Sequence, residues 1–422
     1  MATLTHPASA EQRGGPDAEQ QRPWVCPEVS ELNDWLIEQG LRQTAMTDVV
    51  QGFCERLVAL GLPLWRGYVS ARTLHPRISA VGHIWRRGIG GERDEYEHAI
   101  IPTDAYLKSP FAYMGDRDLE RMRIRLAREA SIGFPLLERF KAEGATDYVA
   151  RLIAYGPPAG PHRTIGFGTS WITDDPAGFS EPQVAILDHL LPRLGLTLGA
   201  RLGQEIAVNL LDAYLGPAAG SRVLQGEIRR GSLDVISAAI LYADFRGFTR
   251  ITDRCERDLL IEMLNDYFDC LVPIVHDHQG QVLKFLGDGL LATFPVDDQG
   301  MGEVCERALD AAAEAVRCIR ALGVERAAND RPVMDLDLAL HQGDVFFGNV
   351  GSVDRLDFTV IGPAVNEASR IEALCSQHDQ PLLMSEAFAN AIGPSRERLV
   401  SIGRFMLRGV RSAQSIYTLE GL

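Results

Sequence analysis

The sequence predicts an α/β (α+β) fold divided into two domains. Its 422 residues exceed the usual size of one domain. From residue 231 onward, segments of strand, helix, hairpin, helix and strand character alternate, as is typical of α/β and α+β domains. A separate mixed series of helical and strand-like segments precedes it. We therefore expect an N-terminal domain over 28–204, a linker over 205–230 and a C-terminal domain over 231–422.

Composition and charge exclude several classes of protein. Hydrophobic residues make up 46% of the chain and charged residues 23%, which is ordinary for a soluble globular protein. The net charge of −15 argues against a general nucleic-acid binder, although it leaves a nucleotide ligand open. No apolar run approaches the roughly 18 residues of a membrane helix, and the N-terminus lacks the apolar core of a secretion signal. We therefore expect a cytoplasmic protein without a membrane span.

The cysteines support the same compartment. Seven are scattered over both halves, and no two form a CxxC pair. This pattern predicts reduced thiols, with neither a disulfide framework nor a zinc site.

The N-terminal elements follow from their apolar spacing. Residues 1–27 are rich in polar residues, Gly and Pro, and predict a disordered tail. Between Ser30 and Leu60 apolar residues recur at spacings near three and four, with a break after Gly40, so we expect two helices. Segments 65–74 and 80–87 flank a turn-prone stretch, as in a β-hairpin. Residues 116–143 are predicted to be helical.

Segments 147–155 and 164–173 are predicted strands, and Ser180 begins a long helix that we expect Pro192 to kink. This order of elements and the ending FSEPQVAILDHL resemble a GAF-type sensor domain, while a PAS-like or new α/β fold stays open. The regulatory ligand or partner of this domain is unknown from the sequence. We interpret His75, His83 and His98 as ordinary strand and loop residues rather than as ligands of haem or metal.

Residues 205–230 carry one apolar helical stripe followed by a Gly-Pro interruption. A stiff segment with a hinge favours a signalling linker between two domains, and a plain surface connector is the alternative.

The most informative stretch is LYADFRGFTRIT, residues 241–252. An apolar strand-like run ends at Asp244, and Gly247 and a helix over 258–275 follow. A carboxylate at the end of a strand beside a glycine turn and a helix N-terminus is typical of a metal-bound phosphate site. A second carboxylate, Asp288, lies on the glycine turn of a predicted hairpin over 281–294.

Three further segments complete the C-terminal domain. We expect a helix over 303–322, a strand, turn and strand over 335–351, and a short strand, Gly-Pro turn and helix over 357–375. On that last helix Asn366 and Arg370 are four residues apart and therefore share a face. The planar, always charged guanidinium of Arg370 suits the charge on a transferring phosphate.

The runs ADFRGFT, KFLGDG and FTVIGPAVNEASR, in this order, resemble the catalytic domain of the class III nucleotide cyclases. The resemblance covers about residues 205–422. It implies a ferredoxin-like domain with a central, mostly antiparallel sheet and flanking helices. It also implies that Asp244, Asp288 and the backbone of Phe245 hold two divalent cations, Mg²⁺ or Mn²⁺. Phe245 departs from the family, which more often has an aliphatic residue there.

The resemblance assigns roles to further positions. Lys284 and Thr359 match the residues that select the base, and the pair favours ATP because it can donate to an adenine ring nitrogen and accept from the exocyclic amine. Asn366 orients the ribose and Arg370 stabilises the transition state. The remaining substrate contacts are Phe245, Gly247, Phe248, Arg355 and Arg408. The resemblance also implies a homodimer whose active sites are shared between two chains.

The sequence therefore predicts an adenylate cyclase that converts ATP to cyclic AMP and pyrophosphate and is regulated by its N-terminal domain. A cyclase for GTP or a pyrimidine nucleotide is one alternative. A catalytically silent nucleotide-binding regulator is the other.

Overall fold

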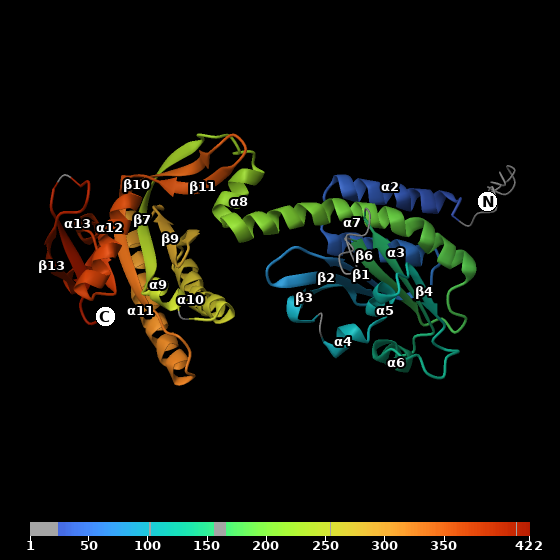
Figure 1. Ribbon diagram of the computed structural model, residues 1–422. Coiled ribbons are helices and arrows are strands. Elements are labelled where there is room, and N and C mark those ends of the chain that lie inside the picture. The colour runs from blue at the N-terminus through green and yellow to red at the C-terminus, as the bar shows by residue number, and fades with distance from the viewer. Residues whose placement is uncertain (1–23, 101–102, 156–165, 254, 411) are drawn as a thin grey trace, which may run out of the picture. The chain divides into compact units, whose positions relative to one another are not determined.

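The computed structural model describes residues 24–100, 103–155, 166–253, 255–410 and 412–422 (Figure 1). The chain divides into two compact units, Met1–Leu210 and Leu211–Leu422. The division lies inside the predicted linker over 205–230, whose signalling role stays a prediction. The predicted tail over 1–27 lies outside the described residues as far as residue 23, and helix α2 begins at Pro27.

The first unit is built on a six-stranded antiparallel sheet with the order β3-β2-β1-β6-β5-β4. Its strands are β1 (Leu64–Arg72), β2 (Ile78–Arg86), β3 (Gly90–Glu97), β4 (Arg121–Ile124), β5 (Asp147–Ala154) and β6 (Gly166–Thr173). One face packs against α2 (Pro27–Leu41), α3 (Met46–Ala59) and the long helix α7 (Glu181–Leu215). On the other side lie α4 (Asp104–Leu107), α5 (Pro110–Asp116) and α6 (Pro135–Ala142), with the 3-10 turn η1 (His98–Ile100) after β3 (Figure 1).

These elements confirm a mixed α/β N-terminal domain with two initial helices, the predicted hairpin and the long helix; its likeness to a GAF domain stays a prediction. The predicted helix over 116–143 is wrong. Within it the structure has β4 and then α6, because Met122, Ile124 and Leu126 recur every second residue, the period of a strand. Asp118, with a φ of +53°, ends the preceding helical segment, and Pro135 begins α6.

His75, His83 and His98 take part in hydrogen bonds within the protein. His75 Nδ1 accepts from the backbone N–H of Arg77 at 3.1 Å, and His98 Nε2 lies 2.9 Å from the carbonyl of His75. The buried His83 pairs through Nδ1 with the Thr47 hydroxyl at 2.9 Å. These contacts fit our interpretation of the histidines as strand and loop residues.

The second unit contains an eight-stranded sheet with the path β13-β14-β12-β10-β7-β9-β8, and β11 pairs with β10. Its strands are β7 (Leu233–Arg246), β8 (Gln281–Leu286), β9 (Gly289–Pro295), β10 (Asp335–Gly351), β11 (Leu356–Ile361), β12 (Leu382–Met384), β13 (Leu399–Phe405) and β14 (Gln414–Leu419). Its helices are α8 (Pro217–Leu224), α9 (Phe248–Thr252), α10 (Arg257–Asp277), α11 (Met301–Ala328), α12 (Pro363–His378) and α13 (Glu386–Ala391), with the 3-10 helix η2 (Pro394–Arg398).

The centre of this sheet confirms the predicted ferredoxin-like topology. The chain runs β7-α10-β8-β9-α11-β10, and the four strands lie in the order β10-β7-β9-β8 with every neighbouring pair antiparallel. Helices α10 and α11 bury their apolar sides on one face of the sheet, and α8 and α12 pack on the opposite face. Alternate residues of β7 therefore point to two different sets of helices.

The predicted turn within 335–351 is wrong, because β10 is one continuous strand. It pairs with β7 along its length, from Asp335 opposite Arg246 to Gly348 opposite Leu233. The glycine that suggested a turn, Gly343, has another reason to be small. A Cβ there would lie 3.0 Å from the Cβ of Ala364, so Gly343 allows α12 to approach the strand closely.

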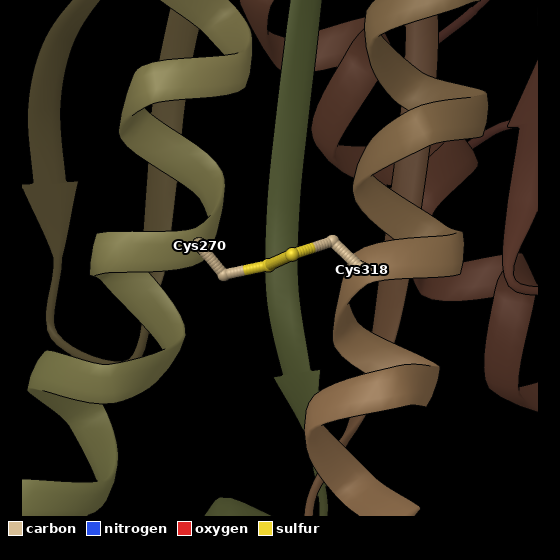
Figure 2. The surroundings of a disulfide bond; sticks show 2 residues. All are labelled: Cys270 and Cys318. Carbon is tan, nitrogen blue, oxygen red and sulfur yellow. A yellow bond between two sulfur atoms is a disulfide. The ribbon is translucent and has the colours of Figure 1, made fainter.

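The prediction that all seven cysteines are reduced is also wrong. Cys270 on α10 and Cys318 on α11 form a disulfide that joins the two helices, with their Cα atoms 6.4 Å apart (Figure 2). No short sequence motif predicts the pair, because the two residues are 48 positions apart and meet only when the helices pack. Among the described residues, no helix combines the length and the apolar character that a membrane crossing requires.

Candidate active site

Asp244 lies on β7, two residues before the strand ends, and on the face that α12 covers. Its neighbour Phe245 points to the opposite face, where its ring packs 5.0 Å from that of Tyr267. Since the side chain of Phe245 is buried in the core, only its backbone is available to a metal ion. The predicted metal role of Phe245 is therefore restricted to its carbonyl oxygen.

The turn between β8 and β9 brings Asp288 beside Asp244. Gly287 has a φ of +75°, which favours glycine, and Gly289 has no room for a side chain. A Cβ on Gly289 would lie 2.4 Å from the carbonyl oxygen of Ala243 and 2.8 Å from Asp244 Oδ1. The two glycines therefore allow the turn to lie against the end of β7, where the two predicted metal ligands come together.

The electrostatics of this region show an excess of negative charge. Burial, followed by the charges of Asp288 and Asp337, raises the pKa of Asp244 to about 6. Burial and the same carboxylate cluster raise the pKa of Glu372, on α12, to about 7. Asp337 is paired with Arg246 at 2.6 Å, so its charge has a partner.

Asp244, Asp288 and Glu372 have no ion-pair partner in the described part of the chain. Two adjacent carboxylates without a cation fit hard divalent ions, which oxygen ligands prefer to bind. Groups of three or more potential metal-binding side chains are absent from the described ranges. The predicted ligand set of Asp244, Asp288 and the Phe245 carbonyl stays a prediction.

Gly247 connects the strand to the short helix α9. Its φ of +83° is left-handed, and a Cβ there would lie 3.1 Å from Arg250 Nη2. Glycine is therefore required for the chain to turn directly behind Asp244. Phe248 begins α9 and packs at the edge of the core. The predicted phosphate contacts of these two residues stay predictions.

An aspartate that sequence reasoning missed connects β8, which carries Lys284, with β11, which carries Thr359; the role of these two residues in base selection stays a prediction. Lys284 on β8 forms a close ion pair with Asp357 on β11. Asp357 and Thr359 are two residues apart on β11, so their side chains lie on the same face of the strand. Lys284 therefore extends toward the face that carries Thr359. Asp357 directly precedes the FTVIG run, and its position beside the motif was the available signal.

Asn366 and Arg370 lie on a side of α12 that faces away from the sheet. The buried residues of the helix are Ala364, Ala368, Ile371 and Cys375. At about 100° per residue, Asn366 and Arg370 point roughly opposite to that buried stripe. The charge of Asp244 contributes to the raised pKa of Glu372. Glu372 lies about 160° around the helix from Arg370. One chain therefore turns Arg370 away from its own carboxylates.

Arg355 and Arg408, two of the predicted substrate contacts, lie in different loops. Arg408 lies in the connection between β13 and β14, next to Gly409, whose ideal Cβ is 3.6 Å from the guanidinium of Arg370. Arg355 lies in the turn between β10 and β11, where its N–H donates to the Ser352 hydroxyl at 3.1 Å. Arg355 thus lies two residues before Asp357, the ion-pair partner of Lys284. Arg408 adjoins Gly409, which lies close to Arg370.

Glu372 is a further residue that the sequence did not reveal. Its position in the segment ASRIEALC has no motif signal, because its neighbour Asp244 belongs to a distant strand. Only the packing of α12 against β7 brings the two carboxyl groups close.

Comparison with known proteins agrees with this geometry. Residues 233–421 match the family model described as "Adenylate and Guanylate cyclase catalytic domain". The chain is 30% identical over 184 residues to an "Adenylate cyclase, terminal-differentiation specific" of Dictyostelium discoideum, which covers 43% of this chain and 8% of the relative. It is 31% identical over 199 residues to an "Adenylate cyclase" of Anabaena cylindrica, covering 46% of this chain and 38% of the relative.

A solved "bacterial light-regulated adenylyl" cyclase aligns over 55% of this chain and 64% of its own, with 22% identity and a TM-score of 0.46. The matched segment spans well under half the length of the relatives from Dictyostelium and Anabaena.

Proposed function

We propose that this chain converts ATP to 3′,5′-cyclic AMP and pyrophosphate, since residues 233–421 match the family model of the adenylate and guanylate cyclase catalytic domain. The observation that carries the proposal is the adjacent pair Asp244 and Asp288, which share one edge of the sheet without a cation. The similarity to two adenylate cyclases supports the choice of reaction.

Asp244, Asp288 and the Phe245 carbonyl would hold two divalent cations, Mg²⁺ or Mn²⁺, which when bound supply charge neutralisation at the triphosphate and activate the ribose 3′-hydroxyl. The chain itself positions the reacting groups. The backbone that turns at Gly247 and enters α9 at Phe248 offers N–H groups to the phosphates. Arg355 and Arg408 would pair with the terminal phosphates.

Recognition of the base rests on Lys284 and Thr359. The lysine ammonium can donate to an adenine ring nitrogen, and the threonine hydroxyl can accept from the exocyclic amine. Asp357 restrains Lys284 through their ion pair and so limits the positions the ammonium occupies. Guanine presents a carbonyl and a donor N–H instead, so this pair suits ATP better than GTP.

The orientation of α12 supports a shared active site in a homodimer. Since Arg370 and the exposed Asn366 point away from the carboxylates of their own chain, a second copy related by two-fold symmetry would supply them. Asn366 would then orient the ribose, and Arg370 would stabilise the charge that develops on the α-phosphate. Two equivalent sites would form at one interface. The N-terminal domain, which resembles a GAF-type sensor, would regulate this assembly.

The test is to incubate the full chain with ATP, GTP, CTP or UTP and Mn²⁺, and to separate the products by chromatography. Cyclic AMP should be the main product, and Asp288→Asn should abolish it. Asp298→Asn, an exposed carboxylate nearby in sequence, is the matched control and should keep activity. Cyclic GMP or a cyclic pyrimidine nucleotide as the main product would reassign the substrate. No cyclic product from any nucleotide would leave only a silent regulator.

A further inference from the structure

One face of the N-terminal sheet carries an unusual set of polar residues. Every second residue of β1 from Arg66 onward points to the side where α5 and α6 lie; these residues are Arg66, Tyr68 and Ser70. Arg66 lies over the ring of Phe140 on α6, 5.0 Å from its centroid, and 5.3 Å from that of Tyr68. A sheet face that packs under helices is normally apolar, so this row requires an explanation.

Arg66 is buried without a counterion. Its side chain is one of the few charged groups in the core, with 8% of the residue exposed, and its Nε has no hydrogen-bond partner among the described residues. Arg86, Tyr68, Tyr96 and Tyr148 are among the titratable groups near it, and Arg66 forms no ion pair with a carboxylate of the described residues. A buried guanidinium normally lies beside a carboxylate or another acceptor, because its desolvation is costly.

A second arginine makes the imbalance larger. Arg86 on β2 lies directly opposite Arg66 in the antiparallel register, and its Nε is also buried and unpartnered. The guanidinium of Arg139 lies 5.5 Å from the Phe140 centroid, and its only close carboxylate is Glu143 at 3.7 Å. Two guanidinium groups, those of Arg66 and Arg139, thus lie beside the Phe140 ring, and Arg66 has no ion-pair partner among the described residues.

Hydroxyl groups and small residues continue the row beyond the arginines. The hydroxyls of Tyr68 and Tyr96 are 3.3 Å apart, and Tyr148 is hydrogen-bonded to Ser170. Gly82, on β2, allows two rings to approach the strand closely, since a Cβ there would lie 2.9 Å from Tyr68 and 3.0 Å from Tyr96. The face therefore offers cations at one end and aromatic rings with hydroxyl groups along its length.

We propose that this face, centred on Arg66 and Arg86, is a binding site for a small organic anion with a carboxylate or phosphate group and a flat apolar body. The planar guanidinium forks suit either anionic group. The aromatic rings suit a flat body. Arg86 is only partly buried, so it provides access from the end of β2. This site lies in the first unit and does not depend on the function of the second.

The five tryptophans, at positions 24, 35, 65, 85 and 171, all lie in the first unit, so tryptophan fluorescence reports its unfolding in the full chain. The probes are phenyl phosphate and benzoate, with benzyl alcohol as the neutral counterpart, all at equal ionic strength. At least one anion should raise the unfolding midpoint saturably by roughly 5 °C. Benzyl alcohol should not.

Arg66→Met should lose this stabilisation, yet its midpoint without anion should equal or exceed that of the native chain, since an unpaired buried cation is replaced by an apolar side chain. Arg87→Gln is the matched control, because Arg87 adjoins Arg86 but is exposed and paired with Asp174. It should keep the anion effect. If Arg66→Met does not fold, Arg86→Met and Arg66→Lys replace it. Arg86→Met should lose the anion effect on the midpoint, and Arg66→Lys should retain part of it.

Three results would overturn the proposal. The first is that neither anion shifts the midpoint. The second is that benzyl alcohol shifts it equally, which would indicate an apolar pocket alone. The third is an anion effect that persists in the folded Arg66 or Arg86 variant.

Discussion

The two halves of the chain show opposite imbalances of charge. On the first sheet, Arg66 and Arg86 lie side by side, and neither forms an ion pair with a described residue. On the second, Asp244, Asp288 and Glu372 gather with no cation among the described residues to pair with them. By contrast, a buried carboxylate in each half is paired, Asp147 with Arg123 at 2.8 Å and Asp337 with Arg246 at 2.6 Å.

The comparison teaches that unpaired charge, rather than charge itself, marks the places where a partner from outside the chain is expected. The net charge of −15 gives no hint of a cationic site, because it sums over groups that are mostly exposed or paired. The structure makes the imbalance local. We expect the carboxylates to bind divalent cations and a nucleotide, and the arginines to bind an anion.

The largest expected effect is the loss of catalysis when the carboxylate imbalance is removed. Asp244→Asn and Asp288→Asn should each reduce turnover with Mn²⁺ by roughly a thousandfold or more, because a neutral amide is a poor ligand for a hard cation. Initial rates of cyclic AMP formation measure this. Circular dichroism should show an unchanged fold. Substantial Mn²⁺-dependent turnover in either variant would remove these residues as metal ligands.

A smaller effect is expected at the base. The double change Lys284→Glu and Thr359→Cys exchanges donors and acceptors, so it should lower kcat/KM for ATP by about 10- to 1000-fold and raise the relative use of GTP. Parallel kinetics with the two nucleotides provide the measurement. An unaltered kcat/KM for ATP would show that these side chains do not read the base.

A matched stability experiment sharpens the comparison between paired and unpaired charge in the first unit. Asp147 is fully buried, and it accepts from Arg123 and from the N–H of Phe179 at 3.1 Å. Asp147→Asn should lower the free energy of unfolding by about 3 kcal/mol, since it removes the buried partner of Arg123 and leaves that guanidinium paired with the exposed Glu181. Urea titration followed by tryptophan fluorescence measures it. Equal losses for Asp147→Asn and Arg66→Met would erase the distinction between the two arginines.

The smallest effect concerns pH. Burial and the charge of Arg93 lower the pKa of His83 to about 4. Because the folded state disfavours the protonated ring, the unfolded chain binds the proton first as pH falls below about 6.5, and stability declines from there toward pH 4. His83→Gln should flatten this decline in tryptophan-monitored unfolding. An identical pH dependence in the native chain and the variant would contradict it.

Much of the second unit could be predicted from sequence, because local patterns and tertiary structure agree there. The strand before Asp244, the glycine turn at Asp288 and the helix carrying Asn366 and Arg370 are each visible in a short window. The failures come from long-range packing. Gly343 is small because α12 approaches, and Cys270 meets Cys318 only through two packed helices.

The proposed anion-binding site of the first unit could not be predicted from the sequence, for a related reason. Arg66 and Arg86 are ordinary residues in two strand-like segments, and their significance lies in the cross-strand register and in the missing carboxylate. A sequence shows which charges exist. Only the fold shows which of them lack a partner.

The most direct test of the shared active site is to mix two inactive variants, Asp244→Ala and Arg370→Ala. Each homodimer should be inactive, because every site would carry one lesion. In a mixed dimer both lesions fall in one site, and the other is intact. With free subunit exchange at equal amounts about half of the dimers are mixed, so roughly a quarter of the native activity should return. No recovery, despite exchange demonstrated with labelled subunits, would mean that one chain builds each site alone.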